Sequence, residues 1–515
     1  MRRIWREHGG DVVAGVSVAL VLVPQALAYA ELAGVPPQVG LSASALPLIA
    51  AALVASSPYL QTGPGALTAL LTLGALEGLA PTGSAEYIQL AALLAIVVGA
   101  SRAVLGLLRL GPLAYLMSEP VLMGFTNAAV ILIIASQLPT AVAASPPEGG
   151  VLWSAAWTIV HPADWQVDAL LFALGTAAIV GVGRRHRLFP SVLVAMVLAI
   201  VVSELTGYDG SVVGSLPDDL IDFSVDLPWS RVGELILPGV VIALVGFAEA
   251  ASIARRYATE DRTPWNPNRE LVSQGAANLV SGVSGGIPVG GSFARSSLNR
   301  LAGARTRWSG AVTGLAVLAF LPFAGVISPL PRAVLAGIVI VAVSGLLTPR
   351  ALIVLMSESK AQTIVAGGTL VATLVLAPHI ELGVAIGIAL SIGAHLYREL
   401  RLEDESSAEG DTLTLRPRGV LWFATANRME QTLVDKMAAH PETTSLVIDM
   451  AGVGRIDYTA AAVLARIVSD AERGGQEVSF INVPLQSDRP LMAHFGHRED
   501  VRRGLGRSPD LDPGG

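Results

Sequence analysis

The stretch GGIPVGGSFARSSLN, residues 285–299, interrupts a largely apolar sequence with a proline, two glycine pairs and an arginine. Proline and clustered glycine cannot continue a helix from the preceding residues, so this stretch predicts a short helix that begins near residue 292. A helix that begins inside a membrane presents unsatisfied backbone N–H groups and the positive end of its dipole. Because such backbone is tolerated only where it lines a cavity, we expect an anion-binding cavity here.

A second stretch, QTGPGALTALLTLG at residues 61–74, contains the same kind of helix breakers. A shift of the chain against itself by 224 residues aligns three features: Pro64 with Pro288, Thr68 with Ser292, and residues 19–30 with 243–254. We interpret this match as a repeat of seven plus seven spans. Since seven is odd, the second unit runs through the membrane in the opposite direction, as in many secondary transporters. Both short helices would then begin near one point of the bilayer midplane.

The composition predicts a polytopic helical membrane protein. The 515 residues are 52% hydrophobic and 15% charged, with a mean hydropathy of +0.59. Long runs rich in Ala, Leu, Val and Gly favour closely packed helices over a β-barrel. About fourteen segments have the composition of spans, at residues 12–30, 41–56, 64–78, 87–106, 112–136, 168–182, 189–205, 235–254, 270–286, 292–302, 307–326, 331–347, 361–377 and 380–397.

Basic residues predict the orientation of these spans. They accompany the even-numbered spans from the fourth onward, beginning with Arg102 and Arg109 and ending with Arg398 and Arg401. By the positive-inside rule both termini are then cytoplasmic, and we expect a multi-pass protein of the cell inner (plasma) membrane. The chain has no cysteine, no HExxH motif and no GxxxxGK[ST] loop. We therefore expect no disulfide, no metal or other cofactor, and no ATP-driven pumping.

The character of the sequence changes after residue 400. Residues 1–400 are expected to form a transmembrane domain, 401–410 an acidic linker, 411–505 a small cytoplasmic α/β domain, and 506–515 a disordered tail. Within the α/β domain, DTLTLRP and GVLWFATA predict a hairpin. The following segments predict two helices and two further strands.

Two charged residues, Arg295 and Glu249, fall inside predicted spans near the cavity. A charge at the bilayer centre costs at least about 2.5 to 3.5 kcal/mol, so Arg295 should face the cavity and meet a bound anion. The alternative is an arginine at the cytoplasmic end of its helix, with a guanidinium that snorkels. Glu249, which aligns with Gln25 in the repeat, could carry a proton, bind a cation such as sodium, or form a fixed ion pair with Arg295. Four hydroxyl residues are weaker candidates, since hydroxyls in such helices often bond to their own backbone: Ser252, Thr68, Ser292 and Ser296.

Four motifs in the right order carry a family resemblance: PQALAYAELAGVPPQVGL, GFTNAAVILIIASQL, GFAEAASIARRYA and SFARSSLNRLAGART. They resemble the SulP anion permease family, also called solute carrier family 26, and the C-terminal domain resembles its STAS domain. The resemblance covers roughly residues 10–500. It implies a core of spans 1–4 and 8–11, a gate of spans 5–7 and 12–14, elevator-type movement of core against gate, and a homodimer. The expected fold is thus an all-α polytopic membrane domain in a 7+7 inverted repeat, with a cytoplasmic α/β STAS domain.

The resemblance also implies the site residues. Arg295 matches the anion-site arginine of the family, Gln25 its first-helix glutamine and Glu249 its eighth-helix acidic residue. The other residues implied to bind substrate lie around the two helix starts: Gly65, Ala66, Thr68, Ser292, Phe293 and Ala294. Ala294 departs from many members, which have serine there. Ile253 stands where sodium-dependent bicarbonate carriers of the family have threonine, which disfavours sodium as the coupling ion.

We therefore expect a secondary active transporter of small oxyanions, sulfate first, with proton coupling through Glu249. Bicarbonate or C4 dicarboxylate are alternative substrates, and an anion exchanger or channel of the same fold is an alternative mechanism. A membrane-anchored STAS signalling protein is the alternative of another class. Tyr458 follows Asp457 where similar STAS domains have a phosphorylatable serine, so we expect no phosphorylation switch here. We expect this domain to have a docking or assembly role instead. We expect neither an enzymatic activity nor a nucleic-acid partner.

Overall fold

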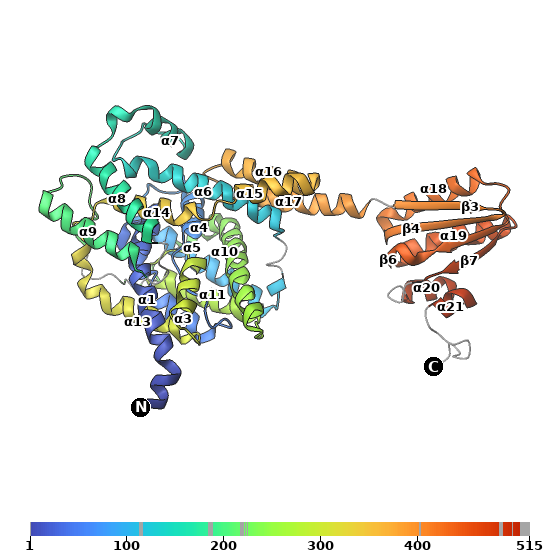
Figure 1. Cartoon of the computed structure of the whole chain (residues 1–515), viewed down its shortest axis with the longest axis horizontal. Coiled ribbons are helices and arrows are strands. Elements are labelled where there is room, and N and C mark those ends of the chain that lie inside the picture. Colours follow the sequence, from blue (N-terminus) through green and yellow to red (C-terminus); the bar gives the residue numbers. More distant parts are fainter. Residues whose placement is uncertain are drawn as a thin grey trace. The chain divides into compact units, whose positions relative to one another are not determined.

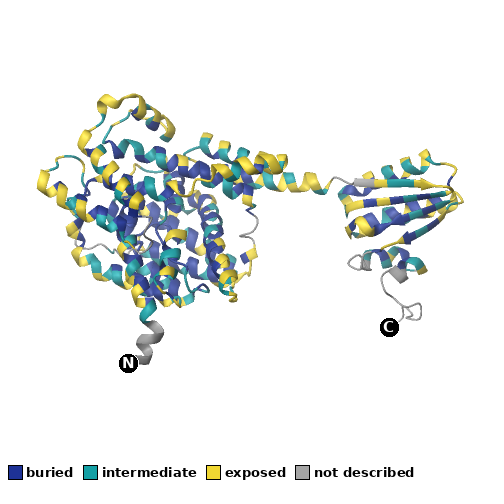
Figure 2. Cartoon of the chain, in the orientation of Figure 1, coloured by how far each residue is buried: buried dark blue, intermediate teal, exposed yellow. Residues whose placement is uncertain are grey.

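The computed structural model describes residues 2–112, 117–183, 189–216, 221, 223, 225–400, 403–483, 488–496 and 498–504. The chain divides into two compact units, Met1–Ser391 and Ile392–Gly515 (Figure 1). In both units buried residues form the interior and exposed residues the periphery (Figure 2). The periphery of the first unit carries large apolar side chains, among them Leu107, Leu205 and Val375. The predicted tail at 506–515 and Arg401 lie outside the described residues.

The first unit is helical. Its helices are α1 (Arg2–Leu32), α2 (Pro37–Ser42), α3 (Leu46–Val54), α4 (Ala66–Leu76), α5 (Ala85–Leu107), α6 (Glu119–Ala141), α7 (Val151–Val160), α8 (Val167–Gly183), α9 (Ser191–Thr206), α10 (Val232–Asp261), α11 (Pro267–Val283), α12 (Phe293–Leu301), α13 (Trp308–Phe320), α14 (Arg332–Ser344), α15 (Pro349–Glu358), α16 (Lys360–Val375) and α17 (Ile380–Glu399). Each predicted span overlaps at least one of these helices, and the span 41–56 overlaps both α2 and α3, whereas α7 and α15 were not predicted. In the described part of the chain, eight helical stretches are long and apolar enough to cross a membrane, and five further apolar helices are shorter. The count of fourteen spans therefore stays a prediction.

Close helix packing in this unit depends on glycine. A Cβ atom on Gly99 of α5 would lie 2.9 Å from the carbonyl oxygen of Gly275 in α11. A Cβ atom on Gly275 would lie 2.9 Å from the carbonyl oxygen of Gly99. The two backbones therefore touch where neither residue has a side chain, as is common between membrane helices.

The two interrupted stretches form short strands before short helices. Strand β1 (Thr62–Gly63) precedes α4, and strand β2 (Gly290–Gly291) precedes α12. The strands pair antiparallel, with Thr62 opposite Gly291 and Gly63 opposite Gly290. Helices α4 and α12 have 11 and 9 residues, fewer than the roughly 20 that a bilayer requires. The prediction of two short helices after helix breakers is confirmed.

Arg102 corrects one step of the orientation prediction. We counted it among the basic residues that follow the fourth span, although the predicted bounds 87–106 include it. It lies within α5 and is fully buried. Its guanidinium donates three hydrogen bonds to backbone carbonyls of other segments. Arg102 therefore gives no support to the predicted orientation, because the positive-inside rule concerns basic residues outside the spans.

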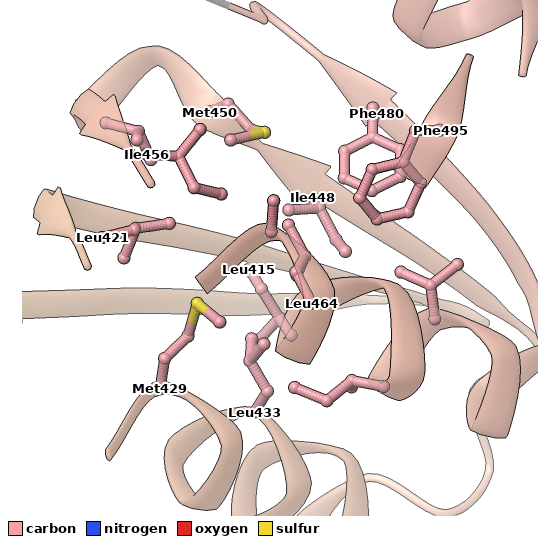
Figure 3. Packing of buried hydrophobic residues seen from close by; sticks show 14 of the residues in the cluster. Leu415, Leu421, Met429, Leu433, Ile448, Met450, Ile456, Leu464, Phe480 and Phe495 are labelled. Atoms are coloured by element: carbon pink, nitrogen blue, oxygen red, sulfur yellow. The ribbon is translucent and has the colours of Figure 1, made fainter. Parts of the chain in front are cut away.

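Helix α17 crosses the boundary between the units at Ser391, and after this helix the second unit is a small α/β domain. Its strands are β3 (Glu403–Glu409), β4 (Thr412–Leu421), β5 (Ser445–Asp449), β6 (Val453–Ile456) and β7 (Glu477–Ile481), and its helices are α18 (Phe423–Ala439), α19 (Tyr458–Arg473), α20 (Asp488–Phe495) and α21 (Glu499–Gly504). The sheet order is β3-β4-β5-β7, with β6 also paired to β4. Only the β3–β4 pair is antiparallel among these described strands. Residues of strands and helices share one apolar core, including Leu415, Leu421, Ile448, Leu464, Met429, Leu433, Phe480 and Phe495 (Figure 3).

Two local predictions for this domain were wrong. Residues 403–409, expected within an acidic linker, form β3 and pair with β4 in a hairpin. DTLTLRP and GVLWFATA do not form a hairpin with each other, because 412–421 is one continuous strand and α18 begins at Phe423. The acidic strand is an edge of the sheet, where charged side chains can remain in water.

Candidate functional site

The starts of α4 and α12 are held together by backbone hydrogen bonds. Besides the β1–β2 pairing, the Ser292 N–H donates to the Gln61 carbonyl at 3.1 Å. Gly65 is the residue before α4, and Ser292 is the residue before α12. These two N-caps are therefore equivalent positions, whereas the ungapped shift of 224 residues aligned Thr68 with Ser292. The alignment therefore needs a gap between the match of residues 19–30 with 243–254 and the two helix starts.

Arg295 lies in the first turn of α12 and is 1% exposed. Its Nη1 donates to Oε1 of Gln25 in α1 at 3.4 Å. Its Nε and Nη2 have no hydrogen-bond partner among the described residues. A Cβ atom on Gly63 of β1 would lie 3.4 Å from Nη2, so the guanidinium faces the paired strands. This burial is inconsistent with a guanidinium that snorkels to the surface.

Glu249 lies in α10, close enough to Arg295 for each charge to act on the other. Within the described part of the chain, no ion pair within 4.0 Å and no hydrogen bond joins the two side chains. The fixed ion pair considered from the sequence is therefore absent from this conformation. The carboxylate and the guanidinium each keep bonding capacity for another group.

The remaining predicted residues lie in two different surroundings. Ala66 and Thr68 are buried in the first turn of α4, and the Thr68 hydroxyl donates to the Gly65 carbonyl at 3.0 Å. Thr68 therefore bonds to its own segment, as hydroxyls in such helices often do. Phe293 and Ala294 are exposed, and the Phe293 ring lies 5.2 Å from the guanidinium carbon of Arg256. The structure thus brings Arg295 together with Gln25 but places Phe293 against a different cation.

A polar stripe along α11 positions the strands, and the sequence interpretation missed it. Asn278 accepts from the Val289 N–H at 2.9 Å and donates to the Val289 carbonyl at 2.9 Å. Gln274 donates to the Thr62 hydroxyl at 2.6 Å. Glu270, one turn earlier, accepts from the N–H groups of Ser56 and Ser57. Polar residues four apart in a predicted span were the available signal, because residues i and i+4 share one face of a helix.

The α/β domain gives Asp457 a structural role. Its side chain accepts from the Ala460 N–H at 2.8 Å and caps α19, and it also accepts from the Phe423 N–H at 2.8 Å. Tyr458 is exposed, and its ring packs on His494 with the centroids 4.7 Å apart. The aspartate therefore joins the starts of α18 and α19. In the part of the chain that the structure describes, no group of three or more His, Cys, Asp or Glu could hold a metal ion.

A helical membrane domain with two interrupted helices that meet beside a buried guanidinium, followed by a small α/β domain, defines the class of multi-pass anion carriers. The model of the Sulfate permease family matches residues 9–369, and a second model, described as Mlab, STAS domain, matches residues 405–499. The chain therefore belongs to the sulfate permease family and carries a STAS domain, and the resemblance found in its motifs is confirmed.

Relatives with curated names are sulfate transporters. The chain is 30% identical to chloroplastic sulfate transporter 4.1 of Arabidopsis thaliana, over 90% of this chain and 74% of that protein. It is 33% identical to a probable sulfate transporter of Mycobacterium tuberculosis, over 74% of this chain and 69% of that protein. It is 26% identical to a sodium-independent sulfate anion transporter of Bos taurus, over 99% of this chain and 90% of that protein.

Solved structures support the fold. The murine solute carrier 26 family member A9 anion transporter in its inward-facing state has a TM-score of 0.86 and 20% identity, over 98% of this chain and 90% of that chain. The transmembrane domain of the cyanobacterial bicarbonate transporter BicA has a TM-score of 0.65 and 23% identity, over 76% of this chain and 98% of that chain. The predicted fold class, a mostly helical membrane domain with a C-terminal STAS domain, is confirmed.

Proposed function

We propose that this chain is a secondary active transporter of small oxyanions, with sulfate as the favoured substrate, and that the anion binds between the starts of α4 and α12. The observation that carries the proposal is the Arg295 guanidinium, which is buried and has two nitrogens without a partner among the described residues. A buried charge without hydrogen-bond partners is costly unless a ligand supplies them. An oxyanion supplies acceptor oxygens and the opposite charge.

The residues around Arg295 fit this substrate. Gln25 accepts from Arg295 through its carbonyl oxygen, which leaves its amide N–H groups for an anion. Gly65 and Ala66 begin α4, and Ser292, Phe293 and Ala294 begin α12. Apart from the Ser292 N–H, which already donates to Gln61, backbone N–H groups of both helices contribute at the positive ends of their dipoles. The curated relatives named sulfate transporters favour sulfate. The bicarbonate named for BicA keeps bicarbonate as the second candidate, ahead of a C4 dicarboxylate.

The coupling ion of the proposal is a proton carried by Glu249. This carboxylate lies near Arg295 without an ion pair to it, so it can change its charge without dismantling a hydrogen-bonded pair. Sodium is the weaker candidate, because Ile253, one turn after Glu249, offers no oxygen ligand. The bovine relative is named sodium-independent, which agrees with a proton.

An elevator-type movement is the proposed transport mechanism, and helix packing supports it. Helix α11 packs on α3 and α5, and α13 packs on α1 and α3, as in the expected core. Separately, α14 packs on α6 and α8, and α16 packs on α6, as in the expected gate. The proposal includes a homodimer, both termini in the cytoplasm, residence in the inner (plasma) membrane, and a docking or assembly role for the STAS domain.

Uptake by proteoliposomes tests the proposal. Purified full-length protein is reconstituted, and labelled sulfate, bicarbonate and a C4 dicarboxylate are offered with and without an imposed pH gradient. Arg295→Ala should abolish uptake, whereas Arg350→Gln, an exposed arginine of α15, should leave uptake unchanged. A melting curve in detergent shows that both variants are folded.

Three outcomes would contradict parts of this proposal. Uptake and anion binding that do not respond to Arg295→Ala would overturn the site. Flux without accumulation against a gradient would indicate a channel. The absence of transport for every anion, with the STAS domain still binding a partner protein, would favour the membrane-anchored signalling protein.

A further inference from the structure

A second arginine, Arg102 of α5, is buried in the membrane unit with no exposed surface. Its Nη1 donates to the Val289 carbonyl at 2.8 Å, its Nε to the Ala243 carbonyl at 3.1 Å, and its Nη2 to the Ile242 carbonyl at 3.2 Å. All three acceptors are neutral backbone groups. Each guanidinium nitrogen therefore has one acceptor, but these hydrogen bonds do not cancel the charge.

No carboxylate balances Arg102. In the described part of the chain, no ion pair within 4.0 Å includes this side chain, and no charged neighbour acts on it. Glu249, the acidic residue of the candidate site, acts on Arg295 instead. A guanidinium keeps its proton in proteins, so the positive charge is permanent. Burial of this charge is costly; the three carbonyls offset part of the cost, and an anion nearby would offset more of it.

The space for the guanidinium is created by a glycine. A Cβ atom on Gly246 of α10 would lie 2.3 Å from Nη2 of Arg102, so any larger residue would displace the guanidinium. The same Cβ position lies 3.5 Å from Cγ2 of Thr68, in the first turn of α4. Arg102 is therefore adjacent to the start of α4, on the side of α10.

The segment that Arg102 holds leads directly into the candidate site. Val289 precedes β2, and a Cβ atom on Gly290 would lie 3.2 Å from Cγ2 of Thr68. Arg102 is thus placed behind the start of α4, and Arg295 lies in the first turn of α12. Two buried cations flank the place where the anion is proposed to bind.

We propose that Arg102 is a specificity-determining residue that favours doubly charged over singly charged anions in this site. It bonds to backbone and does not touch the anion, so it acts through its electric field. The interaction energy of two charges is proportional to their product, so the field of Arg102 stabilises a dianion twice as much as a monoanion. This inference rests on the proposed function, because it requires an anion between α4 and α12.

Binding measurements on the full-length protein in detergent test the inference, with sulfate as the doubly charged probe and nitrate as the singly charged probe. Arg102→Gln removes the charge and keeps amide donors for the carbonyls. It should lower the ratio of sulfate affinity to nitrate affinity on the order of tenfold, since the loss of one unit of charge interaction in a partly screened interior is worth roughly 1 to 2 kcal/mol. Arg102→Lys keeps the charge and should keep the ratio, even if both affinities fall. Arg350→Gln is the matched control and should change neither affinity.

The outcomes separate this inference from the proposed function. Equal losses of sulfate and nitrate affinity in Arg102→Gln would mean that Arg102 only supports the fold, and would overturn the inference. If Arg102→Gln does not fold, a lowered ratio in Arg102→Lys would overturn it instead. Arg295→Ala should abolish binding of both anions in the same assay. Full binding after Arg295→Ala would overturn the proposed function, whatever the effect of Arg102.

Discussion

Thr62 and Gly291 are directly opposite each other in the antiparallel pair of β1 and β2, although they belong to the two halves of the membrane unit. This pairing fixes the starts of α4 and α12 in one place. The Thr62 hydroxyl accepts from Gln274 of α11, so the pair is also tied to the helix that packs behind it. The anion site proposed here depends on this junction, because both helix dipoles meet there.

The first prediction concerns the space at this junction. A Cβ atom on Gly291 would lie 2.9 Å from Cδ1 of Leu60 and 3.1 Å from Cα of Ala250, so Gly291→Ala forces β2 away from α10. Overpacking of this kind costs about 1 to 3 kcal/mol. We expect a lower melting temperature in detergent and weaker sulfate binding. Gly367→Ala is the control, since a Cβ atom there meets nothing within 4 Å. Equal melting temperatures for the two variants would contradict the prediction.

The sequence predicted this junction in part. Pro64, Pro288 and the glycine pairs are local helix breakers, and their effect does not depend on tertiary structure. The pairing of Thr62 with Gly291 had no such signal, because two-residue strands have no periodicity to detect. The sequence therefore indicated where the helices begin, but not what holds their starts together.

Arg102 shows where sequence reasoning was wrong for a physical reason. An arginine near the end of an apolar segment normally lies at the membrane surface, because burial is costly. Here three backbone carbonyls accept hydrogen bonds from Arg102, and Gly246 leaves room for its guanidinium. These groups come from segments distant in sequence. Residues 403–409 are a second case, since the acidic composition of β3 suggested a linker whereas its pairing with β4 makes it a strand. In both cases, contacts with segments distant in sequence determine the local structure.

A second prediction concerns Glu31 of α1 and Arg332 of α14, which form an ion pair at 3.3 Å. These helices belong to the proposed core and gate, so an elevator movement must break this pair. Glu31→Gln and Arg332→Gln should therefore shift the equilibrium between the two end states equally, by about 0.2 to 1 kcal/mol, since Arg332 is partly exposed. Because the chain has no cysteine, one cysteine is introduced at the site, and its accessibility to a thiol reagent in each variant measures this shift. The double variant should add nothing to either single change, and additive effects would show that the pair is not coupled.

The third prediction concerns pH and the STAS domain. Burial raises the pKa of the Asp449 carboxyl, but hydrogen bonds from Asn482, the Ala451 N–H and Arg416 lower it more, so its pKa lies below the ordinary value of 3.8. A carboxyl with a lowered folded-state pKa stabilises the fold above its unfolded pKa of about 3.9 and loses this contribution as the pH falls through the folded pKa. Asp449→Asn should therefore cost about 1 to 2 kcal/mol at pH 7.

Urea unfolding of a fragment of residues 403–515, which contains the whole apolar core of the domain, measures this difference. The difference between the wild type and Asp449→Asn should shrink below about pH 4, because the protonated aspartate no longer has the charge that the asparagine lacks. A difference that stays constant from pH 7 to about pH 2.5 would mean that the carboxylate charge contributes nothing. Asp435→Asn, a change outside this hydrogen-bonded group, serves as the control.

The last prediction joins Glu249 to the charge of the anion. Arg102 and Arg295 carry two positive charges, and an ionised Glu249 leaves one of them unbalanced. Nitrate then balances the site without a proton, whereas sulfate balances it only when Glu249 is protonated. Sulfate binding should therefore take up about one proton and nitrate binding none. Calorimetry in two buffers with different ionisation enthalpies measures this uptake.

In Glu249→Gln, which cannot be ionised, sulfate should bind without proton uptake, and pH-driven accumulation should be lost while exchange of sulfate for sulfate continues. Glu234→Gln, an acidic residue of the same helix paired with Arg231, should behave as the wild type. Full pH-driven accumulation by Glu249→Gln would exclude this carboxylate as the proton carrier, because no charge change at position 249 would then be needed for coupling.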